Sequence, residues 1–138
     1  MILEHKHLVI RSEMESPPNS TEVEFVKGWI KELVRRLDMK IMSGPYVEYC
    51  DMVGNKGITG ICIIETSHIA MHVWDETSPA IIQLDVYSCG ALDPKIVFDM
   101  LEPFDPVKIE YKFFDREHGL ELVDTGIKIQ NESQSKVA

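Results

Sequence analysis

The chain has 138 residues, of which 44% are hydrophobic, and this size suits one compact domain with a buried core. Its formal net charge of −9 at pH 7 argues against partners with exposed phosphates, so neither nucleic acid nor an anionic membrane surface is an expected ligand. An acidic balance is compatible with a small cationic ligand, although it more often serves solubility alone.

The three cysteines, Cys50, Cys62 and Cys89, are odd in number and form no CxxC pair. Neither a disulfide framework nor a zinc knuckle is therefore expected, and reduced thiols indicate a cytoplasmic location. Residues 1–7 lack the apolar segment of a signal peptide, and no apolar run approaches the ~20 residues of a membrane helix. We therefore expect no membrane partner.

The chain begins with a predicted strand and a predicted helix. The apolar centre Leu8-Val9-Ile10 predicts a strand over residues 5–11, and a loop with two prolines follows. Thr21 and Glu24 have the spacing of a capping box, which marks the start of a helix. Apolar residues at helical spacing extend this helix to about residue 38. They are Val23, Val26, Ile30, Leu33, Val34 and Leu37.

Four strands are predicted in the middle of the chain, over residues 40–52, 58–64, 68–74 and 80–88. The Gly44-Pro45 step requires a bulge or an edge position in the first of them. The second is a nearly continuous apolar run, which is typical of a buried strand. The third alternates, with Ile69, Met71 and Val73 on one face and His68, Ala70, His72 and Trp74 on the other.

The last third of the chain predicts a helix and a final strand. Asp93-Pro94 combines a capping residue with a proline at the first helical position, and this helix should end before Pro103. Alternating apolar residues over 107–113 predict the last strand. We expect one domain over residues 1–125 and a flexible, polar tail over residues 126–138.

The predicted order is β-α-β-β followed by β-β-α-β, which indicates an α+β fold. We expect a two-layer α/β sandwich, in which an antiparallel sheet of about six strands carries two helices on one face. Two helices leave the other face of so large a sheet uncovered. That face favours a homodimer or a higher homo-oligomer.

The candidate chemistry centres on His68, His72 and Cys89. Four residues of strand separate the two histidines by ~13 Å, too far to share a metal ion whose ligands lie ~2 Å away, so no metal is expected. Cys89 with His72 could act as a nucleophile and its base, but no oxyanion-hole motif accompanies them. Taken singly, each of these residues is better explained by core packing or turn polarity than by catalysis.

The combination of residues is more specific than any one of them. Thr59 lies in the glycine-flanked segment Gly57-Ile58-Thr59-Gly60, Ser67 follows eight residues later, and His72 follows Ser67 by five. Cys89-Gly90 comes after an intervening strand. With His7-Leu8-Val9 and Asp93-Pro94, this arrangement over residues 5–120 resembles the pyruvoyl-dependent S-adenosylmethionine decarboxylase proenzymes of prokaryotes.

The resemblance implies that the chain cuts itself. Ser67 Oγ would attack the carbonyl carbon of Thr66, and elimination would then release residues 1–66 as a β chain from residues 67–138 as an α chain. The new terminus of the α chain would carry the cofactor, a covalent pyruvoyl group made from Ser67.

The resemblance also assigns roles in the reaction. His72 would accept the proton in the elimination, since an imidazole titrates near neutrality. Thr59 would take the place of the serine that holds the ester intermediate. The substrate amine would join the pyruvoyl group as a Schiff base, and after loss of carbon dioxide the thiol of Cys89 would return a proton to the carbanion.

The implied activity is that of S-adenosylmethionine decarboxylase in polyamine and spermidine biosynthesis. Three positions depart from the family: Thr66 replaces the usual glutamate, Arg11 replaces an acidic residue, and Met52-Val53 lie where an aromatic residue stacks on adenine. A pyruvoyl-dependent arginine or ornithine decarboxylase therefore stays open as an alternative. So does a non-catalytic, unprocessed paralogue that binds or regulates an active partner.

One geometrical gap remains in this hypothesis. In a straight strand, Ser67 and His72 would point to opposite faces and lie ~16 Å apart. Either a sharp break near residues 65–67 or a site shared between subunits, as in bacterial members of the family, has to close it.

Overall fold

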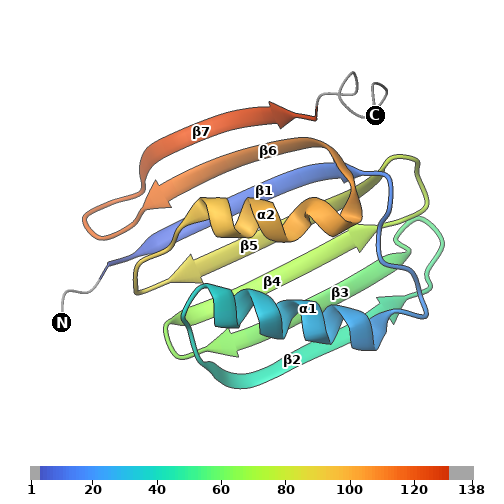
Figure 1. Cartoon of the computed structure of the whole chain (residues 1–138), viewed down its shortest axis with the longest axis horizontal. Helices are drawn as coiled ribbons and strands as arrows, with labels where there is room; N and C mark the ends of the chain where they lie inside the picture. Colours follow the sequence, from blue (N-terminus) through green and yellow to red (C-terminus); the bar gives the residue numbers. More distant parts are fainter. Residues whose placement is uncertain (1–3, 131–138) are drawn as a thin grey trace.

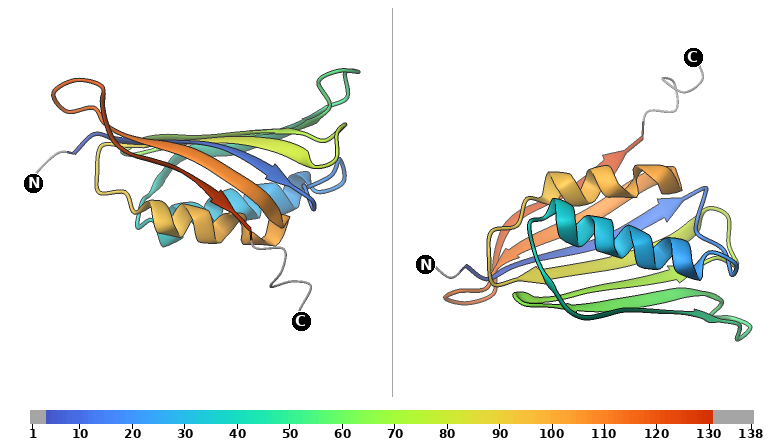
Figure 2. Two further views of the ribbon diagram at one scale, coloured as in Figure 1. Left: turned by 90° about the horizontal axis from the view of Figure 1, so that it is seen from above. Right: turned by 60° about the horizontal axis from the view of Figure 1, so that its bottom comes forward.

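The computed structural model describes residues 4–130 and places seven antiparallel strands in one sheet of order β2-β3-β4-β5-β1-β6-β7. Both helices lie on one face of this sheet (Figures 1 and 2), so the predicted α+β sandwich is confirmed. The strands are β1 Lys6–Met14, β2 Ile41–Cys50, β3 Gly57–Ile64, β4 Ser67–Trp74, β5 Ala80–Ser88, β6 Pro106–Asp115 and β7 Glu121–Ile129. The helices are α1 Val23–Arg36 and α2 Pro94–Leu101, and a 3-10 turn, Glu102–Phe104, follows α2.

The core fills the space between the helices and the sheet. Along β4, Ile69, Met71 and Val73 are buried against the helices, as the alternation predicts. The indole N–H of Trp29 in α1 donates to the carbonyl oxygen of Met100 in α2 at 2.8 Å. This bond satisfies a buried donor and connects the two helices across the core.

The predicted start of α1 is wrong in detail. Glu22, not Thr21, is the capping residue of α1, and its side chain makes no capping hydrogen bond. Asn19 accounts for the difference, because its side-chain oxygen accepts the N–H of Thr21 and its own N–H donates to the carboxylate of Glu22, both at 2.9 Å. Short polar side chains compete in this way for the free backbone donors that precede a helix. At α2 the prediction is confirmed, since Asp93 accepts the N–H of Lys95.

Strand β7 is the largest departure from the sequence prediction. It pairs with β6 at the edge of the sheet and extends to Ile129, so residues 126–129 do not belong to a tail. Nearly all of its side chains are exposed, and a strand without a buried face has no hydrophobic alternation to reveal it. Residues 131–138 of the predicted tail lie outside the described residues.

Within the described part of the chain, no helix covers the opposite face of the sheet. We call it the helix-free face, and the register places a row of side chains across it: Tyr46, Ile61, Ala70, Asp85 and Val9. Strand β3, predicted as buried, has Ile61 and Ile63 exposed there by 45% and 44%. An apolar surface on a sheet face is typical of a contact with another protein surface.

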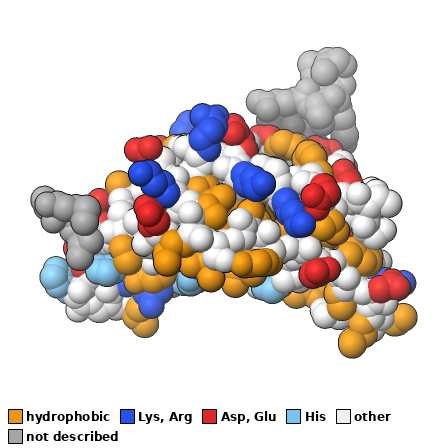
Figure 3. Space-filling view, turned by 90° about the horizontal axis from the view of Figure 1, so that it is seen from below, with side chains coloured by type: hydrophobic (Ala, Val, Ile, Leu, Met, Phe, Trp, Pro, Cys, Tyr) orange, Lys and Arg blue, Asp and Glu red, His pale blue; other side chains and the backbone are white. Residues whose placement is uncertain are grey.

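The space-filling view in Figure 3 shows the molecule from the side of β2 and α1. Hydrophobic side chains form a band across the middle, most of the visible Lys and Arg side chains lie above it, and His side chains lie along its lower side. At this edge, β2 shifts its register around Gly44-Pro45, as predicted. Within residues 4–130, neither helix is long and apolar enough to cross a bilayer.

Two glycines, one at the β3–β4 contact and one in α1, allow a test of the fold. Gly57 has a φ of +152°, and an added Cβ would lie 1.6 Å from the carbonyl oxygen of Val73. Gly28 in α1 has nothing within 4 Å of its Cβ position. We expect Gly57→Ala to lower the free energy of unfolding by ~2 kcal/mol or more, and Gly28→Ala to raise it by ~0.5–1 kcal/mol. Urea denaturation measures both, and equal effects would contradict the packing described.

Candidate active site

The turn between β3 and β4 presents the Thr66–Ser67 peptide bond. β3 ends at Ile64, and β4 starts at Ser67, whose register partners are Ile64 and Ser88. Only two residues connect the strands, and Ser67 adopts a φ of +148°, a value that residues other than glycine rarely take. Such a conformation costs ~1–3 kcal/mol and is held by its surroundings. The strain lies at the bond that the sequence predicts to break.

Cys89 contacts this peptide bond from the end of β5. Its backbone N–H donates to the carbonyl oxygen of Thr66 at 2.6 Å. Its Sγ lies 3.4 Å from Ser67 Oγ. A donor on a carbonyl oxygen draws electrons from the carbon and stabilises negative charge that develops on the oxygen during nucleophilic attack. The structure therefore brings Thr66, Ser67 and Cys89 together.

A second pair of candidate residues lies on the helix-free face. Thr59 and His72 are register partners on β3 and β4, and Thr59 Oγ1 lies 3.2 Å from His72 Nδ1. Both side chains are exposed, so the imidazole can reach a group that approaches this face. The structure thus brings these two predicted site residues together as well.

The two groups do not meet within one chain. Ser67 pairs with Ile64, whereas His72 pairs with Thr59, five residues farther along the same uninterrupted strand β4. That spacing corresponds to ~16 Å. The β3–β4 ladder runs without a register shift from Ser67 to His72, so the unusual backbone at Ser67 does not interrupt β4.

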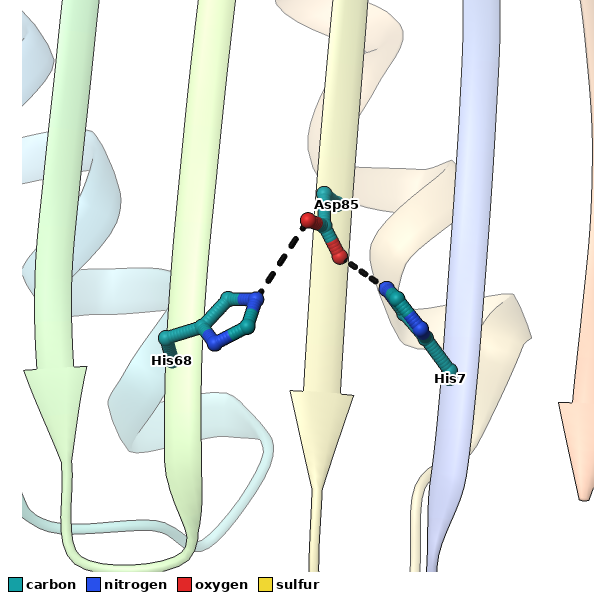
Figure 4. Close-up of side chains that lie close together, drawn as sticks. All are labelled: His7, His68 and Asp85. Atoms are coloured by element: carbon teal, nitrogen blue, oxygen red, sulfur yellow. Dashed lines mark hydrogen bonds and ion pairs between the residues drawn. The ribbon is translucent and has the colours of Figure 1, made fainter. Parts of the chain in front are cut away.

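Three further side chains, from β1, β4 and β5, converge on the helix-free face (Figure 4). Asp85 lies between two histidines: one carboxylate oxygen contacts His7 Nε2, and the other lies 3.3 Å from His68 Nε2. We call His7, Asp85 and His68 the histidine–aspartate array. Sequence reasoning missed it because the spatial order of the strands is needed to place these residues side by side. The signals in the sequence were the two histidines themselves and a charged residue within the apolar strand 80–88.

Arg116 determines how the array is protonated. Its guanidinium lies 3.1 Å from His7 Nδ1 and also stacks over the ring of Tyr87, with Cζ 4.2 Å from the ring centroid. Arginine can only donate, so His7 Nδ1 accepts and Nε2 carries the proton that is donated to Asp85. Burial raises the pKa of Asp85, but the interactions of its carboxylate with His7 and His68 outweigh burial and hold the pKa below the ordinary value. The carboxylate is therefore ionised at neutral pH.

The array also has the composition of a metal site, since its ligand atoms lie within 4.8 Å of one another. A metal-bound histidine normally donates its second ring N–H to an acceptor. His7 instead turns that nitrogen toward a cationic donor, Arg116. The array is therefore better suited to hydrogen bonding than to holding a cation.

Two hollows lie on the helix-free face. The smaller, of about 230 Å³, lies between the array and His72, and its lining includes His7, Ala70, His72, Gln83 and Asp85. The larger, of about 590 Å³, includes Arg11. Arg11 Nη1 donates to Glu13 at 3.2 Å, so a neighbouring carboxylate already engages this guanidinium. Met52 and Val53 lie in the β2–β3 loop and are exposed.

Comparisons with known proteins agree on one family. The S-adenosylmethionine decarboxylase family model matches residues 6–117. S-adenosylmethionine decarboxylase proenzymes from Pyrobaculum arsenaticum and Clostridium botulinum are similar to this chain. The first is 38% identical over 63% of this chain and 67% of its own, and the second is 34% identical over 64% and 73%.

A solved structure gives the same result at the level of the fold. The crystal structure of the adenosylmethionine decarboxylase from Aquifex aeolicus covers 91% of this chain and 99% of its own, with a TM-score of 0.60 and 19% identity. Because the family model spans most of the chain, membership does not depend on this likeness. The chain belongs to the S-adenosylmethionine decarboxylase family, a family of carboxy-lyases.

Proposed function

We propose that this protein is a self-processing, pyruvoyl-dependent decarboxylase that acts on S-adenosylmethionine in polyamine biosynthesis. The observation that carries the proposal is the geometry around one peptide bond. The Thr66 carbonyl accepts a hydrogen bond from Cys89, and the adjacent Ser67 has a strained backbone. The relatives named above are called proenzymes, which agrees with a chain that matures by cleavage.

Processing requires an acyl shift followed by an elimination. Ser67 Oγ bonds to the carbonyl carbon of Thr66, the C–N bond breaks, and the hydroxyl proton moves to the nitrogen. The Cys89 N–H supports the negative charge on the carbonyl oxygen during this step. A base then removes the Ser67 Cα proton, and the Thr66 carboxylate leaves. Water releases ammonia from residue 67, which leaves a ketone there.

We propose that His72 and Thr59 act from a second copy of the chain. They are ~16 Å from Ser67 within one chain, but they are exposed on a face with apolar residues and without helices. Two copies in contact through this face would bury Ile61 and Ile63 and could bring the His72–Thr59 pair to the partner's Ser67. The site would then require a homodimer or a higher homo-oligomer.

In decarboxylation, the ketone at residue 67 would withdraw electrons from the substrate carbon that loses carbon dioxide. Cys89 Sγ, 3.4 Å from Ser67 Oγ, is placed to deliver a proton there. We infer that this chemistry takes place in the cytoplasm, where the three cysteines would stay reduced.

The first prediction concerns the polypeptide itself. We expect freshly purified protein to consist of two fragments, residues 1–66 and 67–138, because Ser67 attacks the preceding carbonyl. Ser67→Ala removes the hydroxyl and should leave one intact chain with unchanged far-UV circular dichroism. Intact-mass spectrometry measures both. An unbroken chain in the unaltered protein would contradict the proposal and favour the non-catalytic paralogue.

A separate experiment addresses the substrate. We expect the processed protein to release carbon dioxide from S-adenosylmethionine and not from arginine or ornithine, because its relatives are S-adenosylmethionine decarboxylases. Carbon dioxide release with each labelled substrate, and the mass of each product, decide between them. The Ser67→Ala protein is the blank. Turnover of arginine or ornithine alone would contradict the proposed substrate. It would show that the exposed Met52-Val53 loop, which has no aromatic side chain, belongs to a site for a smaller amino acid.

The shared site can be tested with two inactive variants. Ser67→Ala cannot be cleaved, and His72→Ala should be cleaved at least ~100-fold more slowly, since it lacks the proton acceptor. When the two variants are refolded together with tags of different mass, the His72→Ala chain should be cleaved in mixed dimers, because its partner supplies His72. No rescue in mixtures that form mixed dimers would place the whole site within one chain.

A further inference from the structure

The segment Ser88-Cys89-Gly90 surrounds Thr66 on more than one side. Besides the bond from Cys89 N–H to the Thr66 carbonyl, the Ser88 hydroxyl donates to Thr66 Oγ1 at 3.3 Å. Gly90 packs against the same residue, since a Cβ added there would lie 3.9 Å from Thr66 Cγ2. Thr66 is therefore held through both its main chain and its side chain.

The other partner of the Ser88 hydroxyl is compatible with donation to Thr66. The N–H of Gly90 donates to Ser88 Oγ at 2.9 Å, and this bond occupies one acceptor position of the oxygen. The hydroxyl proton is then free to point at Thr66 Oγ1. Ser88 has no exposed surface, so water does not compete for this proton.

We propose that Ser88 is a positioning residue for self-cleavage at the Thr66–Ser67 bond, an inference that rests on the proposed self-processing. The Cys89 bond alone leaves Thr66 free to rotate about its main-chain and side-chain torsions. A second hydrogen bond on the side chain removes this freedom and keeps the carbonyl directed at the Cys89 N–H. Holding a reacting group in this way lowers the entropy that must be lost in the transition state.

The proposal gives residue 66 a function of its own. Threonine carries its hydroxyl directly on Cβ, and this oxygen accepts the Ser88 proton at 3.3 Å. Ser88 and Thr66 thus form a matched pair in this chain. Ser88 donates no proton to the reaction and forms no covalent bond, so its effect must pass through Thr66.

The test is a double-mutant cycle on the rate of cleavage. Thr66→Val keeps the shape of the side chain without its hydroxyl, and Ser88→Ala removes the donor. In pulse-labelled cell-free synthesis, we expect each variant to cleave roughly three- to tenfold more slowly than the unaltered chain. The double variant should be no slower than the slower single variant, because both remove the same bond.

Two controls separate positioning from a general loss of stability. Thr66→Ser retains the hydroxyl and should cleave at close to the unaltered rate. Ser12→Ala removes another fully buried hydroxyl, which donates to the carbonyl of Lys108. Lys108 is in β6, which is separated from β4 by β5 and β1 in the sheet. Ser12→Ala should lower the melting temperature and leave the cleavage rate unchanged.

The outcomes are distinct from those that test the proposed function. If the unaltered chain is never cleaved, the proposed function fails. If the unaltered chain is cleaved and Thr66→Val matches its rate, or if the slowing in the double variant equals the product of the single effects, the positioning role of Ser88 is wrong. Thr66 is less buried than Ser88. Thr66→Val therefore keeps the test valid even where Ser88→Ala does not fold.

Discussion

The hydrogen bond from the Cys89 amide to the Thr66 carbonyl is the interaction on which the proposed chemistry depends. Its length of 2.6 Å requires β5 to end beside the β3–β4 turn, and the antiparallel ladder between β4 and β5 provides this by pairing Ser67 with Ser88. The ladder continues in register to the far end of β4, where Trp74 pairs with Ile81. Because register is set along the whole length of both strands, the buried faces of β4 and β5 determine where the amide points.

The helix-free face combines features that a surface exposed to water does not need. It holds an ionised aspartate between two histidines, an arginine stacked on a tyrosine, and exposed isoleucines on β3. Polar networks gain strength where water is excluded, and apolar side chains gain stability when they are covered. Contact with a second copy would meet both conditions and would place the exposed His72 next to another chain.

Much of this fold could be predicted from the sequence, for reasons that differ between elements. Strand β5 and the start of α2 follow from the alternation of Ala80–Ser88 and from the Asp93-Pro94 cap, which are local signals. Strand β7 has no buried face, so its existence depends on the ladder with β6 and not on any pattern of its own. The capping of α1 was decided by Asn19, a competitor that lies outside the helix.

The candidate site divides in the same way. The resemblance of their arrangement to the proenzyme family identified Ser67, His72, Cys89 and Thr59. The structure groups them as Ser67 with Cys89 and Thr59 with His72. The histidine–aspartate array could not be predicted, because His7 and Asp85 are 78 residues apart and become neighbours only through the strand order β4-β5-β1. A short sequence motif shows which reactive side chains lie close together along one strand. The order of strands in the sheet determines which side chains from different strands become neighbours.

The position of β1 has a consequence for the mature protein. β1 lies between β5 and β6 in the sheet, although it precedes the proposed cleavage site after residue 66 and they follow it. The shorter product of cleavage would therefore remain threaded through the middle of the longer one, with hydrogen-bonded ladders on both of its sides. Cleavage of the backbone would therefore leave the fold intact. The two fragments could dissociate only if the whole sheet unfolded.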